Sequence, residues 1–471
     1  MTTHRNILLT LLVSLTLSSC NLLGPVDDIQ PDFVLTDDDV ITDSNSAEYL
    51  LNGIYSRYRE RSLTSMRNGM FILTGTLNNT TVAEGATNFR ENNLRPQNNT
   101  VLNYYTGLYA IINQSNSLIA NLRDAHPKGL TEARKAEILG EAYFHKAFAE
   151  FMLLRSFGEF WDRSSDYGVV LYNEPVRGND EAKRRAPVEE CYTQILSDLD
   201  EAAAAPAYDG RAYRVNGVTV QMLRARVLLY MGRFADAATT ARTAIADATA
   251  GGASLETDYL TVFAQGFSSP ETLFAPYVSY PLETMGTILT TDVNLGYGTT
   301  VSRIADELAG TTGDELYDAR YTAAFQPMSL KKYVLNNATT GDNNTYYFMR
   351  LPELYLILAE AEAREGNYPQ AREALQPVAT RAGYAEDYAD GIADGDLLLT
   401  IFRHKYMELS AENYEEWYDM VRYHRLDGTD FTATGLGYTQ SMQHLVLPIP
   451  TQALSGNSLL VQNPTYEISN H

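Results

Sequence analysis

The sequence predicts a mainly α-helical fold with long loop insertions and a few short strands. Apolar residues recur at helical spacing along most of the 471-residue chain. Two segments repeat one helix–turn–helix pattern, and two long stretches rich in Asn, Thr, Gly and Tyr interrupt it. With 45% hydrophobic and 20% charged residues, the composition is that of a folded domain rather than a disordered chain.

The first twenty residues have the pattern of an exported bacterial lipoprotein. A short positive start precedes an apolar run from Ile7 to Leu17, which is too short to cross a bilayer core of roughly 30 Å as a helix. The run ends in Leu-Ser-Ser-Cys, the order of a bacterial lipobox. We therefore expect residues 1–19 to be a signal peptide and Cys20 to carry a lipid anchor. An ordinary signal peptide with an incidental cysteine is the alternative.

Residues 20–45 form the next segment, an acidic tether that holds too little apolar surface to fold by itself. Residues 46–471 are expected to form one domain. The chain has 59 acidic and 36 basic residues and a net charge of -23, which disfavours nucleic acid as a partner. No other segment has the length of apolar sequence that a membrane span needs, so we expect membrane contact only through the lipid anchor.

Helices are expected wherever the apolar stripe is bounded by capping or breaking residues. Ser46 is a candidate cap for the first helix, Gly158 ends a long one, and Pro187 and Pro206 stand at the start and just past the end of another. The expected helices span residues 47–58, 102–122, 131–157, 187–205, 216–231, 235–248, 352–365 and 369–382.

Two of these helix pairs repeat one another. Ala225, Gly232, Phe234 and Ala237 recur with the same spacing as Ala359, Gly366, Tyr368 and Ala371. Small residues let two helices approach closely and the glycine supplies the turn, as in tetratricopeptide-type hairpins. The pairs lie 134 residues apart, so insertions separate them, and we place these at about 64–100 and 251–345. The second insertion holds a β-prone piece from Thr272 to Val278.

Three segments resemble the SusD/RagB family of surface glycan-binding lipoproteins. Residues 346–361, followed by Gly-Asn-Tyr at 366–368, match one family block almost position for position. Residues 408–422 resemble a second block, although Asn413 replaces a glycine and His-Lys-Tyr stands where Glu-Arg-Arg is usual. The tail from Leu447 to Tyr466 resembles a third, with Thr465 at its glycine position.

The resemblance implies a helical scaffold of tetratricopeptide-like hairpins whose loops form a ligand face. It also implies a non-catalytic protein, anchored by lipid to the outer membrane and facing the cell exterior. Members of the family pass oligosaccharides, and in some cases peptides, to a SusC-like TonB-dependent transporter. Peptide capture by the same scaffold is therefore one alternative to glycan binding.

A search for catalytic motifs in the sequence finds none of the zinc-protease, nucleophile-elbow, P-loop or dinucleotide-binding patterns. We accordingly expect no enzyme activity, cofactor or metal. Carboxylate pairs for glycoside hydrolysis are defined by distance in space rather than in sequence, so a glycoside hydrolase stays as a further alternative. The densest acidic cluster, Glu412, Glu415 and Glu416, is expected to face solvent.

Sugar recognition needs aromatic ring faces beside a few polar side chains. The only two tryptophans, Trp161 and Trp417, follow or lie within scaffold segments and are expected to pack, as are Tyr105, Tyr109, His145 and Cys191. The platform must then come from aromatic residues in or beside the insertions. The expected ligand-binding residues are Phe71, Phe89, Tyr277, Tyr280, Tyr297 and Tyr346 as ring platforms, with Asn78, Asn79, Asn88 and Arg90 as partners for sugar hydroxyls.

Overall fold

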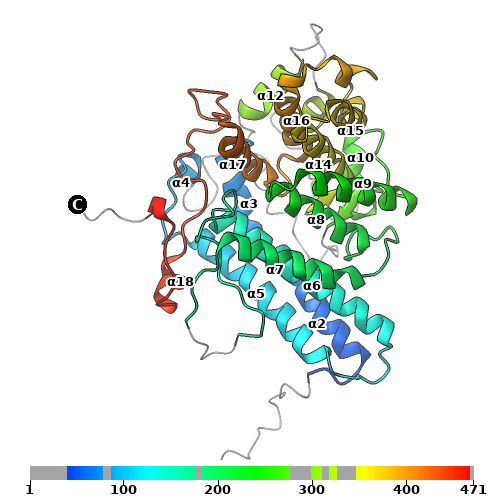
Figure 1. Cartoon of the computed structure of the whole chain (residues 1–471), viewed down its shortest axis with the longest axis vertical. Helices are drawn as coiled ribbons and strands as arrows, with labels where there is room; N and C mark the ends of the chain where they lie inside the picture. The colour runs from blue at the N-terminus through cyan, green and yellow to red at the C-terminus, as the bar shows by residue number, and fades with distance from the viewer. Residues whose placement is uncertain are drawn as a thin grey trace, which may run out of the picture.

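A computed structural model describes residues 40–77, 86–176, 182–275, 299–309, 318–325, 332 and 346–466. Helices dominate this part of the chain, and its only strands are β1 (Thr272–Phe274) and β2 (Met349–Arg350), which pair antiparallel. The predicted fold class is confirmed (Figure 1). No helix among these residues is long and apolar enough to cross a bilayer.

The helices follow the order of the sequence pattern. They are α2 (Ser44–Arg57), α3 (Arg61–Leu73), α4 (Ala86–Arg90), α5 (Asn99–Leu122), α6 (Glu132–Phe157), α7 (Val188–Glu201), α8 (Gly217–Tyr230), α9 (Phe234–Ala250), α10 (Tyr259–Gln265), α12 (Thr299–Ala309), α13 (Ala319–Phe325), α14 (Leu351–Arg364), α15 (Tyr368–Arg381), α16 (Asp394–Leu409), α17 (Glu415–Asp427) and α18 (Thr451–Gly456).

The first helix begins earlier than expected. Asp43 is its cap, accepting a hydrogen bond from the Ser46 backbone N–H at 2.8 Å, while the Ser46 hydroxyl accepts from the Asp43 backbone N–H at 3.0 Å. Ser46 is thus the returning partner of a capping box rather than the cap. The far end of α6 agrees with the prediction, since α6 ends at Phe157 and Gly158 is its C-cap.

The two repeated helix pairs are neighbours in space. The α8–α9 and α14–α15 hairpins meet where α9 packs against α14 (Figure 1). Gly232 and Gly366, at the two turns, have φ angles of +73° and +78°, a conformation that glycine adopts without steric cost. Ala225 and Ala359 are both fully buried, as close helix packing requires. The hairpin prediction is therefore confirmed.

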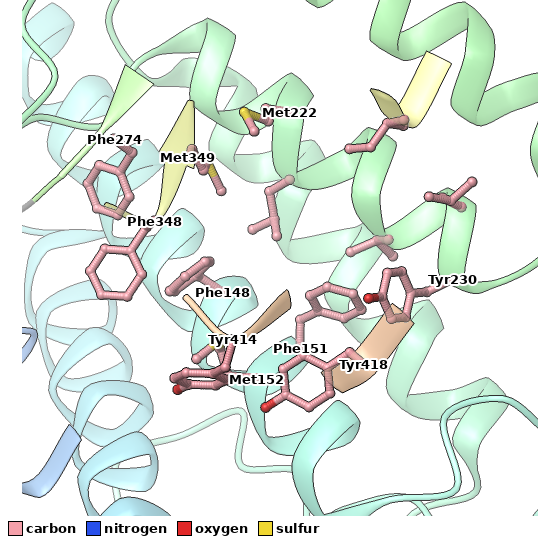
Figure 2. Packing of buried hydrophobic residues seen from close by; sticks show 14 of the residues in the cluster. Phe148, Phe151, Met152, Met222, Tyr230, Phe274, Phe348, Met349, Tyr414 and Tyr418 are labelled. Atoms are coloured by element: carbon pink, nitrogen blue, oxygen red, sulfur yellow. The ribbon is translucent and has the colours of Figure 1, made fainter. Parts of the chain in front are cut away.

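The core between these hairpins and α6 is strongly aromatic (Figure 2). Phe148 packs edge-to-face on Phe348 at 5.5 Å between ring centroids, and Tyr58 packs on Phe274 at 5.9 Å. The backbone N–H of Phe348 donates to the Phe274 carbonyl at 3.0 Å, which ties the two ends of the second insertion together.

The residues that we assigned to the interior are mostly buried. His145, Cys191 and Trp417 are 0%, 0% and 2% exposed, and Cys191 is a free thiol. Tyr105 is buried, and Tyr109 and Trp161 are partly buried against the core.

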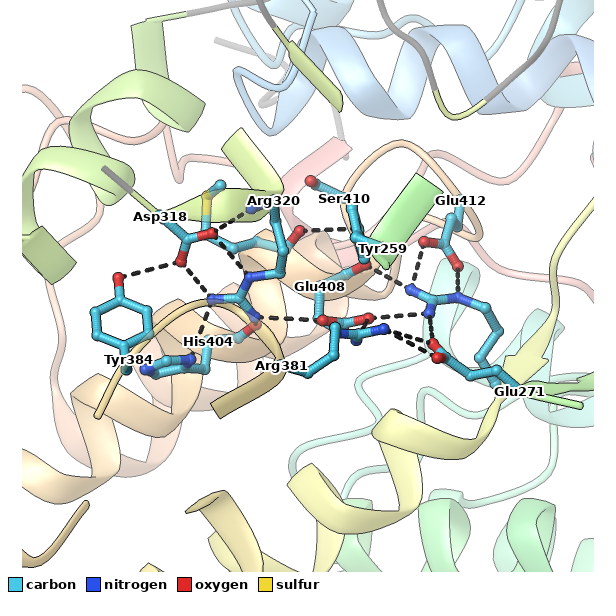
Figure 3. Close-up of polar contacts among 12 residues, drawn as sticks. Tyr259, Glu271, Asp318, Arg320, Arg381, Tyr384, His404, Glu408, Ser410 and Glu412 are labelled. Carbon is cyan, nitrogen blue, oxygen red and sulfur yellow. Dashed lines mark hydrogen bonds and ion pairs between the residues drawn. The ribbon is translucent and has the colours of Figure 1, made fainter. Parts of the chain in front are cut away.

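Three glutamates do not lie where we expected them. Glu412, Glu415 and Glu416 are each 2% exposed, so the prediction that they face solvent is wrong. Glu415 pairs with Arg155 and Arg226 of the scaffold. Glu412 joins a buried ionic network centred on Arg350, which also bonds Glu271 and Glu408 (Figure 3). The spacing of these three glutamates in the sequence did not indicate that other parts of the chain cover both sides of the segment.

Candidate functional site

Described parts of the two long insertions contact the same segment of the chain. The Thr439 hydroxyl donates to the Leu73 carbonyl at 2.8 Å, just before the first insertion becomes irregular. The adjacent Tyr438 carbonyl accepts a hydrogen bond from the Thr300 hydroxyl at 2.7 Å, at the start of α12 inside the second insertion. The segment at residues 438–439 therefore holds both insertions side by side.

A second contact joins α3 to the chain that follows the second insertion. The Arg67 guanidinium lies 3.9 Å from the ring centroid of Tyr346, the first described residue after the second insertion. A cation above an aromatic face is attracted by the ring quadrupole. Arg67 and Tyr346 are 279 residues apart in sequence, and we call the side of the molecule that carries these contacts the ligand face.

Three aromatic residues that we expected to bind ligand are buried. Phe71 is 0% exposed on α3, and Phe89 and Tyr346 are each 3% exposed. The Phe89 ring packs so closely on Gly69 that a Cβ there would lie 2.4 Å from it. The Tyr346 ring lies 4.5 Å from the Phe348 ring. These rings support the scaffold beneath the ligand face, which corrects their expected role as exposed platforms.

Two of the four polar candidates of the first insertion are described and accessible. Asn88 and Arg90 are both partly exposed on α4. Part of the first insertion is also helical, since α3 extends to Leu73 where we expected irregular chain from residue 64. The remaining predicted residues, Cys20, Asn78, Asn79, Tyr277, Tyr280 and Tyr297, lie outside the described residues.

A segment that sequence reasoning missed fixes α4 in place. Asn92 has a φ angle of +50° and its amide donates to the carbonyls of Ser441 and His444 at 3.2 and 2.7 Å. The Gln443 amide returns a bond to the Asn92 carbonyl at 2.8 Å. An asparagine tolerates this left-handed conformation, and Asn92 was the one signal in the sequence for such a turn.

Beneath the ligand face lies a buried carboxyl group. The Thr76 hydroxyl donates to Glu416 Oε1 at 3.2 Å, and Thr76 also bonds the Tyr406 hydroxyl at 2.8 Å. Burial raises the pKa of Glu416 to about 8, so the group is largely protonated at neutral pH.

Two observations concern metal ligands and histidines among the described residues. No group of three or more His, Cys, Asp and Glu side chains among them is arranged to hold a metal ion. Burial lowers the pKa of both His145 and His404 to about 3, which keeps these imidazoles neutral.

Comparison with known proteins agrees with this architecture. Residues 30–215 match a SusD-like family model described as starch-binding and associating with the outer membrane, and residues 309–466 match the SusD family model. The two matches together cover most of the chain and define it as a SusD-like protein. The chain belongs to the SusD/RagB family.

Individual relatives are distant. SusD-like protein P38 of Formosa agariphila is 24% identical over 244 residues, which are 51% of this chain and 45% of that protein. The match therefore spans less than half the length of this curated relative.

Solved structures share the fold over nearly all of their length. A SusD superfamily protein from Bacteroides vulgatus has a TM-score of 0.75 and 20% identity, covering 90% of this chain and 99% of its own. NanU from B. fragilis has a TM-score of 0.71 and 22% identity, covering 93% and 100%. A laminarin-binding SusD-like protein has a TM-score of 0.66 and 21% identity, covering 90% of this chain and 99% of its own.

Proposed function

We propose that this chain is a lipid-anchored glycan-binding protein of the bacterial outer membrane that passes oligosaccharide to a SusC-like TonB-dependent transporter without altering it chemically. The observation that carries the proposal is the convergence of two long insertions on one side of a SusD-type scaffold. Loops held side by side on rigid helices are where binding residues concentrate.

The chemistry of the ligand face supports a sugar ligand. Asn88 and Arg90 are polar groups of the kind that bond sugar hydroxyls, and both are partly exposed. We assign the ring platform to Tyr277, Tyr280 and Tyr297, with Asn78 and Asn79 as further hydroxyl partners. One structural relative is named for laminarin, a polysaccharide, which is consistent with this ligand class.

Gel retardation against a polysaccharide panel tests the binding. The purified chain is expected to be retarded by at least one polysaccharide without releasing new reducing ends. Arg90→Ala and the triple change of Tyr277, Tyr280 and Tyr297 to Ala should each weaken retardation. Arg233→Ala, an exposed arginine at the α8–α9 turn, is the matched control and should leave it unchanged.

Two results would contradict the proposal. If new reducing ends appeared and a Glu-to-Gln substitution abolished them, the protein would be a glycoside hydrolase. Retention of peptides but of no polysaccharide would favour peptide capture. Delivery is tested separately, because the transporter should copurify with the chain from solubilised outer membranes.

A further inference from the structure

A concave surface lies beside α18, whose Thr451 backbone N–H donates to the Pro96 carbonyl of the first insertion at 2.9 Å. A groove of about 570 Å³ runs between α5, the segment at residues 170–176 and α18. This volume falls within the roughly 300–1,000 Å³ typical of small-molecule sites. None of the residues that line the groove belongs to the insertions at 64–100 and 251–345.

The lining is uncharged throughout. Every residue that forms the groove is apolar, a tyrosine, an amide, a threonine or a glycine. This is unexpected in a chain with 20% charged residues and a net charge of -23. A charged ligand would find no ion-pairing partner among the lining residues, and the Lys183 ammonium lies behind Tyr172, so we expect the groove to favour neutral ligands.

Three tyrosines form one wall. Tyr105 and Tyr109 lie 4.8 Å apart between ring centroids, and Tyr172 stands edge-on to Tyr109 at 5.8 Å. The Tyr109 hydroxyl donates to the Val170 carbonyl at 3.1 Å, which fixes the ring against the neighbouring segment. The Lys183 ammonium lies 4.7 Å from the Tyr172 centroid and holds that ring from one side. The wall is therefore rigid before any ligand arrives.

Amide groups provide the polar contacts. Asn113 lines the groove, its Oδ1 accepts a hydrogen bond from the Val176 backbone N–H at 2.6 Å, and its amide nitrogen makes no hydrogen bond with any other described residue. Gln452 is exposed on α18 at the opposite edge. Rigid rings with amide donors on either side are the arrangement that a sugar ring requires, because its C–H faces are apolar and its rim is hydroxylated.

One exposed apolar residue also lines the groove. Val176 is 38% exposed, and it is one of five large hydrophobic residues that are exposed in the described part of the chain. An exposed apolar side chain beside rings and amides adds to the surface that a ligand could cover.

We propose that the groove between α5 and α18 is a second carbohydrate-binding site, which takes a neutral oligosaccharide independently of the ligand face. The occupant is a chain of uncharged sugar rings, because the lining combines tyrosine rings and amides with a complete lack of charge. Such a site would hold a long glycan at a second point and raise its effective concentration at the first.

The test uses a fluorescent reporter inside the groove. Tyr172→Trp keeps an aromatic ring in place, and Trp161 and Trp417 provide the same background in every variant. Maltohexaose, cellohexaose, laminarihexaose and the acidic hexagalacturonate are titrated separately into the purified full chain that carries Y172W. We expect at least one neutral hexasaccharide to give a saturable signal and hexagalacturonate to give none.

A second substitution distinguishes the groove from the rest of the surface. Thr106 is exposed and lines the groove, so Thr106→Arg in the reporter chain should obstruct it and raise the Kd about tenfold or more. Asn103→Arg is the matched control, because Asn103 is exposed on the same helix but does not line the groove. Its Kd should stay within about twofold of the reporter chain.

Several outcomes would overturn this proposal. One is a reporter chain whose fluorescence responds to none of the three neutral hexasaccharides. A second is an equal fluorescence response to hexagalacturonate. A third is an equal rise of the Kd in the T106R and N103R variants. Unchanged sugar binding in T106R together with lost copurification of the transporter would instead make the groove a protein-docking surface. If the reporter is silent while polysaccharide still retards the chain in gels, the groove inference fails and the proposed function stands.

Discussion

At the scale of single residues, two adjacent glutamates occupy opposite electrostatic environments. Burial acts to raise the pKa of Glu415, but Arg155 and Arg226 more than offset it and the pKa falls to about 2. Glu416 forms no ion pair within the described residues, and burial raises its pKa to about 8. A charged and a neutral carboxyl group thus stand side by side at the start of α17.

Glu416 predicts a specific pH dependence of stability. Its folded pKa of about 8 lies above its ordinary value of 4.5, so the folded chain holds a proton that the unfolded chain releases. This contribution to stability is complete below about pH 4 and is lost as the pH rises through about 8. Glu416→Gln removes the titration, so between about pH 5 and about pH 9 the variant should lose less thermal stability than the parent chain.

Thermal melts of the two proteins across this pH range provide the measurement. Because other groups titrate in both chains, only the difference between their melting curves is informative. Parallel curves would show that Glu416 does not titrate in this interval. The predicted effect is on the order of a few kcal/mol at most, since one unit of pKa shift corresponds to about 1.4 kcal/mol.

Arg350 gives the sharpest prediction for the buried ionic network. Its guanidinium bonds Glu412 at 2.8 Å, Glu408 at 2.9 Å and also Glu271, and all of these side chains are buried. Arg350→Met would remove one buried cation from these carboxylates, which keep Arg381 and Lys332 as partners, and breaking a buried ion pair costs about 3–5 kcal/mol. Chemical denaturation should show this loss. Arg163→Ala, which breaks a half-exposed pair with Glu189, should change the unfolding free energy by less than about 1 kcal/mol.

At the scale of elements, the two hairpins depend on small residues. Ala359 on α14 is fully buried, in the helix that α9 and α15 both contact. Ala359→Leu should destabilise the chain by about 1–3 kcal/mol, because a packed interface has no room for the larger side chain. Ala235→Leu, on the exposed side of α9, should change the free energy of unfolding by no more than about 0.5 kcal/mol. Equal melting temperatures for both variants would contradict close packing at Ala359.

The same elements show what a sequence can predict and where prediction stops. Local sequence signals were enough to predict the hairpins and the end of α6. A turn glycine, a small buried residue and a C-cap glycine affect mainly the residues next to them. The burial of Phe89 and Tyr346 depends on contacts with Gly69 and Arg67. Tyr346 is far from Arg67 in sequence, and helical or loop spacing carries no information about such a partner.

The candidate site was predicted only in part for the same reason. The positions of the insertions indicated where a ligand face would form, and Asn88 and Arg90 remain accessible there. Asn92 and the segment around Gln443 hold α4 in place through contacts between residues that are distant in sequence, and only the structure showed these contacts. The proposed tyrosine groove was not predicted because Tyr105 and Tyr109 also fit the stripe of a scaffold helix, where Tyr105 is buried and Tyr109 is partly buried.

At the scale of the whole molecule, the proposed function requires that the folded domain be tethered rather than inserted. No described helix is long and apolar enough to be a membrane span. In the proposed function, a lipid on Cys20 attaches the chain to the membrane. Each methylene buried in the bilayer contributes roughly 0.8 kcal/mol, and several acyl chains together make anchoring stable. The first described helix, α2, begins at Ser44, 24 residues after Cys20, and we propose that ligand binding does not require the anchor.

Cys20→Ala should therefore separate location from binding. The variant, expressed in a bacterium with an outer membrane, should be lost from the membrane fraction, while the protein that is recovered is retarded by polysaccharide in the same way as the parent chain. Cys191→Ala is the matched control, since the Cys191 thiol is buried in the core and that variant should stay in the membrane fraction. Retention of C20A in the membrane would show that attachment comes from elsewhere in the chain. Loss of polysaccharide binding by recovered C20A would show that the anchor and the ligand face are coupled.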